Sequence, residues 1–469
     1  MRHQNEQLTP TTFIGIIIPD RSRNLRVILN ILVTCVLSGC ASYQKAPLDL
    51  AVPLKPSVAM LNHRLPAGGV VPTVSPLRAG DVVALALLNN PQLIAARAQH
   101  NVAKADLLSA GMLPDPVFSG GFSALLGGPG DAPSIAGSLT EDVSALITYS
   151  VNKRAARAGL AQVDAGVLWQ EWQVAAQVEQ LCITIDGDVQ TLAILQAERA
   201  ALAALQASTS NAVASGNLTL AEASSSMAAL AAMDTVLNTQ QQTLAQDRDQ
   251  LDALLGLQPG IPVAVTLPAV PQIDPTLAKA EIASLATRRP DLIALRFGYE
   301  QADARLRAAI LTQFLPVTIG PSGGRDTTKV FSAGPTVTLT LPLFNRNRGG
   351  IASASATRAQ LAAQFQANLA GTAGDAGALL ARIALLQAQS AVADANAANA
   401  TNTAVLAQSA FKNGNLDALS AVNLQTASAD RQREAIALRV ELDTARLSLA
   451  TLLGVGLPSM AHSALEPNT

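Results

Sequence analysis

The chain contains the same long unit twice, and this duplication restricts its fold more than any other feature. The hexapeptide Asn-Pro-Gln-Leu-Ile-Ala at 90–95 returns 199 residues later, at 289–294, as Arg-Pro-Asp-Leu-Ile-Ala. Gly-Asn-Leu at 216–218 returns at 414–416, an offset of 198. The period is far longer than that of solenoids or propeller blades. The sequence therefore predicts two large, structurally equivalent halves.

The composition favours long helices that pack closely on one another. Only 14% of the residues are charged and 3% are aromatic, while alanine and leucine dominate. Such a composition suits helix pairs better than one thick globular core. The net charge of -2 offers no electrostatic attraction to nucleic acid, so no nucleic-acid partner is expected.

The N-terminal segment has the pattern of a secretory signal. Three arginines precede an apolar stretch at 27–37, and Leu-Ser-Gly-Cys overlaps its end. This order predicts a signal peptide at 1–39, which is too short to be a spanning helix. The tetrapeptide resembles the bacterial lipobox, which makes Cys40 the lipidated first residue of the mature chain and predicts a lipid anchor, and Ala41 favours the outer membrane. An ordinary signal peptide with an incidental cysteine is the alternative.

The rest of the chain divides by proline content and by the repeat. A proline-rich stretch without periodicity predicts an extended tether. Each repeat is expected to hold short helices, a β-hairpin and a long helical hairpin. The expected segments are the signal peptide at 1–39, an extended N-terminal tether at 40–76, a first structural repeat at 77–270, a second at 271–458 and a C-terminal tail at 459–469.

Each repeat changes from a helical to a strand period after its first helices. In the first repeat, strands are expected at 117–126 and 137–151, on either side of a Gly/Pro loop. In the second, a strand runs from about 315, a loop covers 322–326, and threonines alternate with apolar residues at 336–341. This alternation gives one polar and one apolar face, as in a half-exposed hairpin.

Each hairpin leads into a long helix. Residues 153 to about 215 contain no proline, and their apolar residues recur in steps of three and four, which is a coiled-coil seam. About 62 residues give a helix of roughly 95 Å, and 351–412 is its equivalent. The return helices are shorter. We therefore expect each long helix to be matched by two shorter ones stacked end to end, with the first and last helices serving the second half.

The strands restrict how the chain can enter a membrane. No apolar helix of about 18 residues is expected in the mature sequence, which leaves a barrel as the spanning structure. Four strands cannot close a barrel, and open edges are not tolerated in lipid. If the strands enter a membrane, several chains must contribute strands to one barrel.

Three short sequence motifs and the two Gly-Asn-Leu tips follow one another in a characteristic order. They are Asn-Asn-Pro-Gln-Leu at 89–93, Arg-Arg-Pro-Asp-Leu at 288–292 and Leu-Pro-Leu-Phe-Asn-Arg-Asn-Arg-Gly at 341–349. In order and spacing the chain resembles the TolC-type outer-membrane efflux channel (outer membrane factor) lipoprotein family from 77 to 457. The phrase at 343–349 is similar to the branch that serves heavy-metal cation pumps.

The resemblance implies a mainly α fold with a small β part. Its expected assembly is a homotrimer with a twelve-stranded β-barrel, continued by an α-helical periplasmic tunnel that docks onto a periplasmic adaptor and an inner-membrane pump. Its expected place is the outer membrane of a Gram-negative bacterium. The implied function is passive exit of a substrate, which is a heavy-metal cation, a drug or a small metabolite. Neither a cofactor nor a tightly bound metal is expected.

The resemblance also implies functional residues at the helix-hairpin tips. Acidic residues just past the turn ring the tunnel aperture in this family, but the matching position after the second tip is Ser420. Glu222 occupies the equivalent position of the first repeat, and Asp417 lies one turn before Ser420. Three copies of these carboxylates would attract cations. Helix capping is the alternative role. The expected adaptor-contact residues are Gly216, Asn217, Leu218, Gly414, Asn415 and Leu416.

Two other classes of protein were weighed against a channel. An enzyme such as a periplasmic lipoprotein hydrolase needs a convergent set of catalytic groups, but the four histidines are scattered and no P-loop or nucleophile elbow occurs. A structural coiled-coil lipoprotein without a pore is favoured by the few aromatic residues in the strand regions: Phe118, Phe122, Tyr149 and Phe331.

Overall fold

The computed structural model describes residues 43–455, except 67, 74, 128–129, 131, 218, 268–269, 271 and 315. The chain divides into two units, Met1–Pro53 and Leu54–Thr469, and the description below concerns the second. Of the first unit, residues 43–53 are exposed and contain neither helix nor strand. The signal-peptide and Cys40 predictions, and the tail at 459–469, lie outside the described residues.

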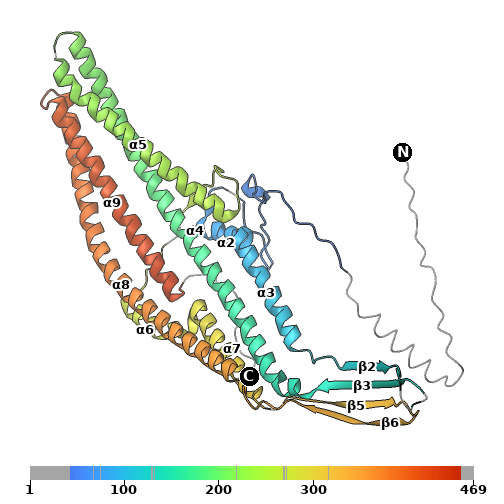
Figure 1. The fold of residues 1–469 in the computed structure, drawn as a ribbon. Coiled ribbons are helices and arrows are strands. Elements are labelled where there is room, and N and C mark those ends of the chain that lie inside the picture. The colour runs from blue at the N-terminus through green and yellow to red at the C-terminus, as the bar shows by residue number, and fades with distance from the viewer. Residues whose placement is uncertain are drawn as a thin grey trace, which may run out of the picture. The chain divides into compact units, whose positions relative to one another are not determined.

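From their first α-helices onward, the two repeats have the same order of elements (Figure 1). After η1 (Val58–Met60) in the N-terminal tether, the first repeat contains β1 (Leu77–Arg78), α2 (Ala79–Asn89), α3 (Pro91–Ala110), β2 (Val117–Ser123), β3 (Ser134–Asp142), α4 (Val143–Ala214), α5 (Leu220–Leu255) and β4 (Val265–Thr266). The second contains α6 (Pro275–Arg288), α7 (Pro290–Leu311), β5 (Val317–Arg325), β6 (Phe331–Leu339), α8 (Arg348–Lys412) and α9 (Ala418–Leu453). The predicted mainly α fold with duplicated hairpins is confirmed.

The predicted end of the first hairpin is wrong. The strand expected to reach 151 ends at Asp142, whose carboxylate accepts the Ser144 N–H at 2.9 Å and caps α4. This cap starts a helix of 72 residues ten positions earlier than the periodicity indicated. Tyr149 therefore lies on α4, where its hydroxyl donates to the Gly111 carbonyl at 3.0 Å, and it adds nothing to an aromatic girdle.

The predicted loop of the second hairpin is also misplaced. Residues 322–325 belong to β5, and the turn covers 326–330. Asp326 closes this turn by accepting the N–H groups of Thr328 and Val330. The glycines that suggest a loop are needed inside the sheet, because a Cβ on Gly324 would lie 2.5 Å from the Ile135 carbonyl oxygen of the neighbouring strand.

The long helices organise the helical part. α4 would reach about 108 Å and α8, with 65 residues, about 98 Å if both were straight. α5 packs along one end of α4 and α7 along the other, as expected for two stacked shorter helices (Figure 1). α9 packs along α8 and crosses to α4. α3, however, packs on α4 rather than on α8 of the same chain.

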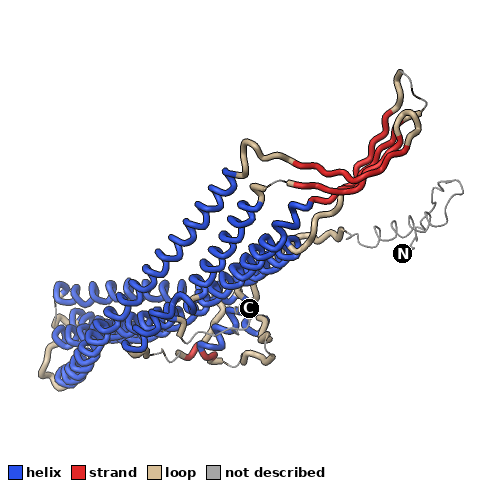
Figure 2. Tube along the Cα trace, turned by 90° about the horizontal axis from the view of Figure 1, so that it is seen from below, coloured by secondary structure: helices blue, strands red, loops and turns tan. Residues whose placement is uncertain are grey.

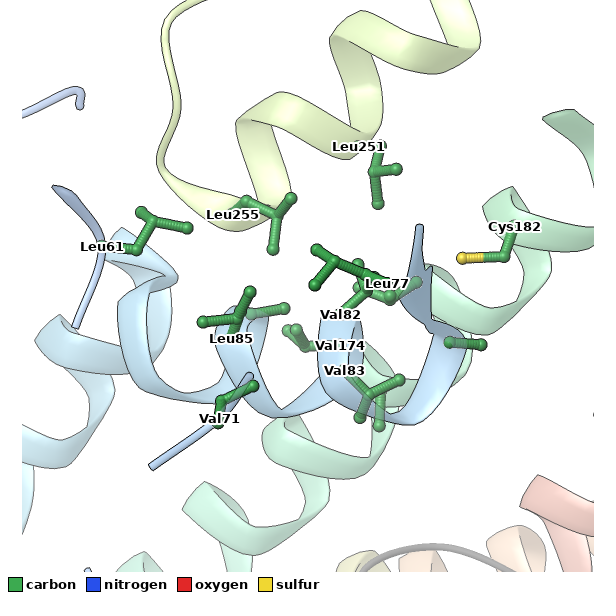
Figure 3. Packing of buried hydrophobic residues seen from close by; sticks show 14 of the residues in the cluster. Leu61, Val71, Leu77, Val82, Val83, Leu85, Val174, Cys182, Leu251 and Leu255 are labelled. Carbon is green, nitrogen blue, oxygen red and sulfur yellow. The ribbon is translucent and has the colours of Figure 1, made fainter. Parts of the chain in front are cut away.

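The largest buried cluster lies where α2 meets the middle of α4 and the end of α5 (Figure 3). The 11-residue α2 is too short to be stable alone, so its apolar side chains must be buried against its neighbours. Those from β1 and α2 pack between the two longer helices. Its central members are Leu77, Val82, Leu85, Val178, Cys182, Leu251 and Leu255.

Asn90 joins three helices at the edge of this cluster. It is the N-cap of α3, and its side-chain oxygen accepts the N–H groups of Gln92 at 2.9 Å and Leu93 at 3.0 Å. Its amide nitrogen donates to the Leu254 carbonyl near the end of α5 at 3.0 Å. The residue is only 2% exposed, so each of these groups would otherwise be buried without a partner.

Replacing Asn90 tests this junction. We expect Asn90→Ala to destabilise the start of α3 by about 1–2 kcal/mol, because the cap and a buried carbonyl partner are lost together. Hydrogen exchange at the amides of Gln92 and Leu93 should accelerate roughly five- to thirtyfold. Asn101→Ala, on the exposed face of the same helix, is the matched control. Equal exchange in both variants would contradict the assignment.

Candidate functional site

The four longer strands form one antiparallel sheet in the order β2-β3-β5-β6 (Figure 2). The two hairpins of the duplicated units are thus joined side by side through β3 and β5. β2 and β6 are the edges, and neither has a second strand partner among the described residues. The strands contain seven to nine residues, slightly fewer than the 9–11 typical of a membrane-spanning strand.

One face of this sheet is apolar across all four strands. Phe118 is 74% exposed and Phe331 is 78% exposed. A continuous exposed apolar surface of this kind marks contact with lipid or with another protein. The cross-strand pairs on this face include Phe118 with Leu139, Phe122 with Ile135, Val317 with Leu339, Ile319 with Val337 and Pro321 with Pro335.

The other face carries hydroxyl groups and glycines but no charge within the sheet. A hollow of about 760 Å³ lies over this part of the sheet. The charged residues of the four strands lie at strand ends, Glu141 and Arg325 on the apolar face and Asp142 on the hydroxyl face. The pairs on the hydroxyl face include Ser119 with Ser138, Thr318 with Thr338 and Ser322 with Gly334. The sheet can therefore border lipid on one face and water on the other.

The two helix-hairpin tips have the same backbone geometry. Gly216 and Gly414 have positive φ angles of 77° and 74°, and no atom lies within 4 Å of an added Cβ. The conformation, rather than crowding, therefore requires glycine. The N–H groups of Asn217 and Asn415 donate to carbonyls five residues earlier, at 2.9 and 2.8 Å, which closes both turns.

The tip side chains differ in how far they are presented to solvent. Asn217 and Asn415 are exposed, while Leu416 is half-buried. Leu218 lies outside the described residues. Contact of the tips with an adaptor stays a prediction, and among the described side chains the two asparagines are the more accessible.

Asp417 caps the returning helix of the second repeat. One of its carboxylate oxygens accepts the Ser420 N–H at 2.8 Å, and the other accepts the Ser420 hydroxyl at 2.6 Å. This hydroxyl, together with the backbone N–H, holds the pKa of Asp417 below its usual value, so the carboxylate stays ionised. Capping does not remove the charge, and an aperture role remains compatible with it.

The first tip has an acidic and a hydroxyl residue at the same two positions, but in the opposite order. Thr219 and Glu222 are the equivalents of Asp417 and Ser420, and Thr-x-x-Glu is the capping-box pattern. Glu222 is the third residue of α5, and its side chain lies outside the description. Aligning the two repeats residue by residue would have revealed this exchange in the sequence.

Besides Asp252 of α5, two buried carboxylates of α4 were missed by the sequence analysis. Glu171 of α4 accepts two hydrogen bonds from the Arg97 guanidinium, at 2.6 and 2.9 Å, which fastens α3 to α4. Glu198 of α4 is 3% exposed, and neither of its carboxylate oxygens has a partner within hydrogen-bond geometry among the described residues. Neither residue stands out in a helical pattern, because a long amphipathic helix contains many carboxylates.

Glu198 faces α9. Burial raises its pKa, and Asp430 adds to this effect, whereas Thr426 and Arg433 act in the opposite direction. Folding therefore disfavours the charged form of Glu198 relative to the neutral form, which couples the contact between α4 and α9 to the protonation of this carboxyl group.

The pH dependence of this contact can be measured directly. The stabilisation from Glu198 should be complete below about pH 4.5, its ordinary pKa, and should be lost as pH rises through the raised pKa. Glu198→Gln keeps the shape without titrating, so it should raise the melting temperature at pH 7 and flatten the melting profile between pH 4 and 8. Asp375→Asn, which removes an exposed carboxylate of α8, is the control. Identical profiles for the three proteins would contradict this role.

Among the described residues, no group of three or more His, Cys, Asp or Glu side chains could hold a metal ion.

One described helix, α8, contains a stretch apolar enough to cross a membrane by length and composition, with a mean hydropathy of 1.4. The expectation that the mature chain contains no apolar helix of about 18 residues is therefore wrong. The stretch is rich in alanine, and α8 packs lengthwise against α7 and α9.

The second repeat matches a known family by sequence. The pattern described as "Outer membrane efflux protein" matches residues 282–455. No curated protein matches the chain significantly by sequence.

Solved structures match nearly the whole fold. The outer membrane protein VceC of Vibrio cholerae superposes with a TM-score of 0.67 at 19% identity, covering 81% of this chain and 96% of VceC. The Campylobacter jejuni CmeC outer membrane channel gives 0.68 at 13%, covering 91% and 96%. The open state of the Neisseria gonorrhoeae MtrE outer membrane channel gives 0.65 at 16%, covering 89% and 98%.

These matches agree with the fold and the outer-membrane location expected from the sequence, and the matched proteins are channels rather than enzymes. Residues 282–455 are thus similar in sequence to the outer membrane efflux proteins, and both repeats have the fold of the solved outer-membrane channels.

Proposed function

We propose that the protein is the outer-membrane exit duct of a tripartite efflux system. Three chains join their four-stranded sheets into a twelve-stranded barrel, which their helices continue as a periplasmic tunnel. An inner-membrane pump supplies the substrate and the energy, and a periplasmic adaptor contacts the tips. The mature chain begins at the lipidated Cys40.

The sheet carries this proposal. It has an apolar face and a polar face without charge except at one strand end, and neither edge strand has a second strand partner among the described residues. In lipid such edges must be paired, and closure into a barrel is the available solution. Pairing β6 of one chain with β2 of the next satisfies both edges at once.

The packing of the helices supports a place for the neighbouring chain. α7 lies between α4 and α8 of its own chain, whereas its repeat equivalent α3 packs mainly on α4 among the described residues. Ile293 of α7 is 6% exposed and packs against Ala165 of α4, but the equivalent Ile94 of α3 is 56% exposed. The repeat equivalent of Ala165 is the exposed Ala363 of α8. Ile94 therefore fits against Ala363 of a neighbouring subunit.

Cysteine cross-linking tests this packing. We expect Ile94→Cys/Ala363→Cys to give a covalent trimer under mild oxidation in outer membranes, because the two positions repeat the Ile293–Ala165 contact. Cys182 is buried and free, and burial raises the pKa of its thiol to about 12, so it should not interfere.

The matched control for the cross-link keeps Ile94→Cys and moves the second cysteine to Leu385, another exposed residue of α8. That pair should give no trimer. A folded protein in which the Ile94/Ala363 pair stays monomeric would overturn the ring and would favour the structural lipoprotein without a pore.

The tips are the proposed aperture and adaptor site. Three copies of Asp417 and Glu222 would place ionised carboxylates around a narrow opening, which attracts cations. The cap geometry of Asp417 supports this, because its carboxylate remains charged while it holds the start of α9. The tip residues proposed to contact the adaptor are Gly216, Asn217, Leu218, Gly414, Asn415 and Leu416.

Channel recordings test the aperture. In planar bilayers we expect wild-type channels to prefer cations and Glu222→Gln/Asp417→Asn to reduce the cation-over-anion permeability ratio several-fold. Asparagine can keep the cap, so the change isolates charge. Channels with unchanged selectivity would leave the duct in place but would reduce both acids to helix caps.

Heavy-metal cations are the first proposed substrate, on the basis of the phrase at 343–349. In the structure this segment forms the junction between β6 and α8, where Asn347 donates to the Ala309 carbonyl at 2.8 Å. Drugs and small metabolites are the alternative, and the uncharged hydroxyl face of the sheet fits them as well as it fits cations.

A further inference from the structure

The first repeat covers its main buried cluster with the segment that follows α5. This segment turns back, and Ile261, Val263 and Val265 pack against the cluster. Its β4 residues pair in parallel with β1, with Leu77 opposite Val265. The cluster is thus closed by an extended strand as well as by helices.

The second repeat builds an equivalent cluster from equivalent residues. Leu449 and Leu453 of α9 take the places of Leu251 and Leu255 of α5, and all four are at most 2% exposed. Leu292 likewise takes the place of Leu93. The second cluster therefore calls for the same kind of cover.

The chain leaves α5 and α9 with the same geometry. Gly256 and Gly454 have positive φ angles of 72° and 70°. The next N–H, of Leu257 or Val455, donates to the carbonyl five residues earlier at 2.8 Å in both cases. As far as Val455, the chain therefore leaves α9 through the same turn that directs it back after α5.

An open groove lies where the covering strand would bind in the second repeat. Its volume is about 370 Å³, and its floor contains Ile273, Leu380, Ile383 and Leu449. The extended residues 272–274 along its side have no strand partner among the described residues. Ala384 lines the groove and is exposed.

The sequence after α9 resembles the covering segment in the spacing of its prolines. Pro458 and Pro467 are nine residues apart, as are Pro259 and Pro268, and one more residue separates Gly454 from Pro458 than separates Gly256 from Pro259. In this alignment the inward positions of Ile261, Val263 and Val265 correspond to Met460, His462 and Ala464. Leu449 lies only five residues before Gly454, so fewer than ten extended residues reach back to the groove.

We propose that residues 456–467 bind in this groove as an added strand beside residues 272–274. The tail would then close the second cluster as residues 257–266 close the first. The first strand has an additional anchor, since the buried Asp252 carboxylate accepts the Ile261 N–H at 3.0 Å. The equivalent residue in α9 is Ala450, so the tail is held less firmly and can be displaced.

Thiol labelling tests this occupancy in the full-length protein. Ala384→Cys should react with a maleimide about tenfold more slowly in the full chain than after deletion of residues 457–469, because the tail covers the groove. Leu385→Cys, 57% exposed and outside the groove, should react equally in both. Equal rates for Ala384→Cys would overturn the proposal.

Cross-linking in the intact chain provides a second test that does not depend on the deletion. Gln272→Cys/Ser463→Cys should form an intrachain cross-link with a short bifunctional thiol reagent, whereas Leu385→Cys/Ser463→Cys should not. Failure of the first pair to react, or links between different chains instead, would overturn the proposal, the latter in favour of a tail that binds a second copy.

Discussion

The unpaired edges of the four-stranded sheet are the constraint on which the rest of the structure depends. An edge strand in lipid leaves its backbone donors and acceptors without partners, which is costly enough to exclude an open sheet. One chain supplies two hairpins, and these cannot curl back on themselves with only four strands. The long helices continue the hairpins, so any ring that closes the strands must also place the helices side by side.

The duplicated frame was predictable because it depends on local signals repeated in register. Pro91 and Pro290 at helix starts, and Gly216 and Gly414 at turns, fix boundaries through backbone geometry alone. The strand ends were not predictable in the same way. Residues 322–325 resemble a loop in composition, yet they lie in β5, because small residues are needed where the neighbouring backbone approaches.

The tip residues show a further limit of sequence reasoning. The turns at Gly216 and Gly414 followed from the sequence, but the hydrogen bonds that hold Asp417 in its cap depend on side-chain geometry. The buried position of Glu198 was equally hidden, since α9 reaches it from more than 200 residues away in the chain. Contacts between the two repeats are long-range, and periodicity reports only which face of a helix is apolar.

The uncharged hydroxyl face of the sheet has a consequence for transport energetics. A water-filled passage bordered by serine, threonine and glycine presents neither a deep well nor a high barrier to an ion of either sign. Such a passage would behave electrically as a simple resistance in series with the narrow tips. Rectification, gating and discrimination would then arise at the periplasmic end, and the outer segment would only set an upper limit on the flow.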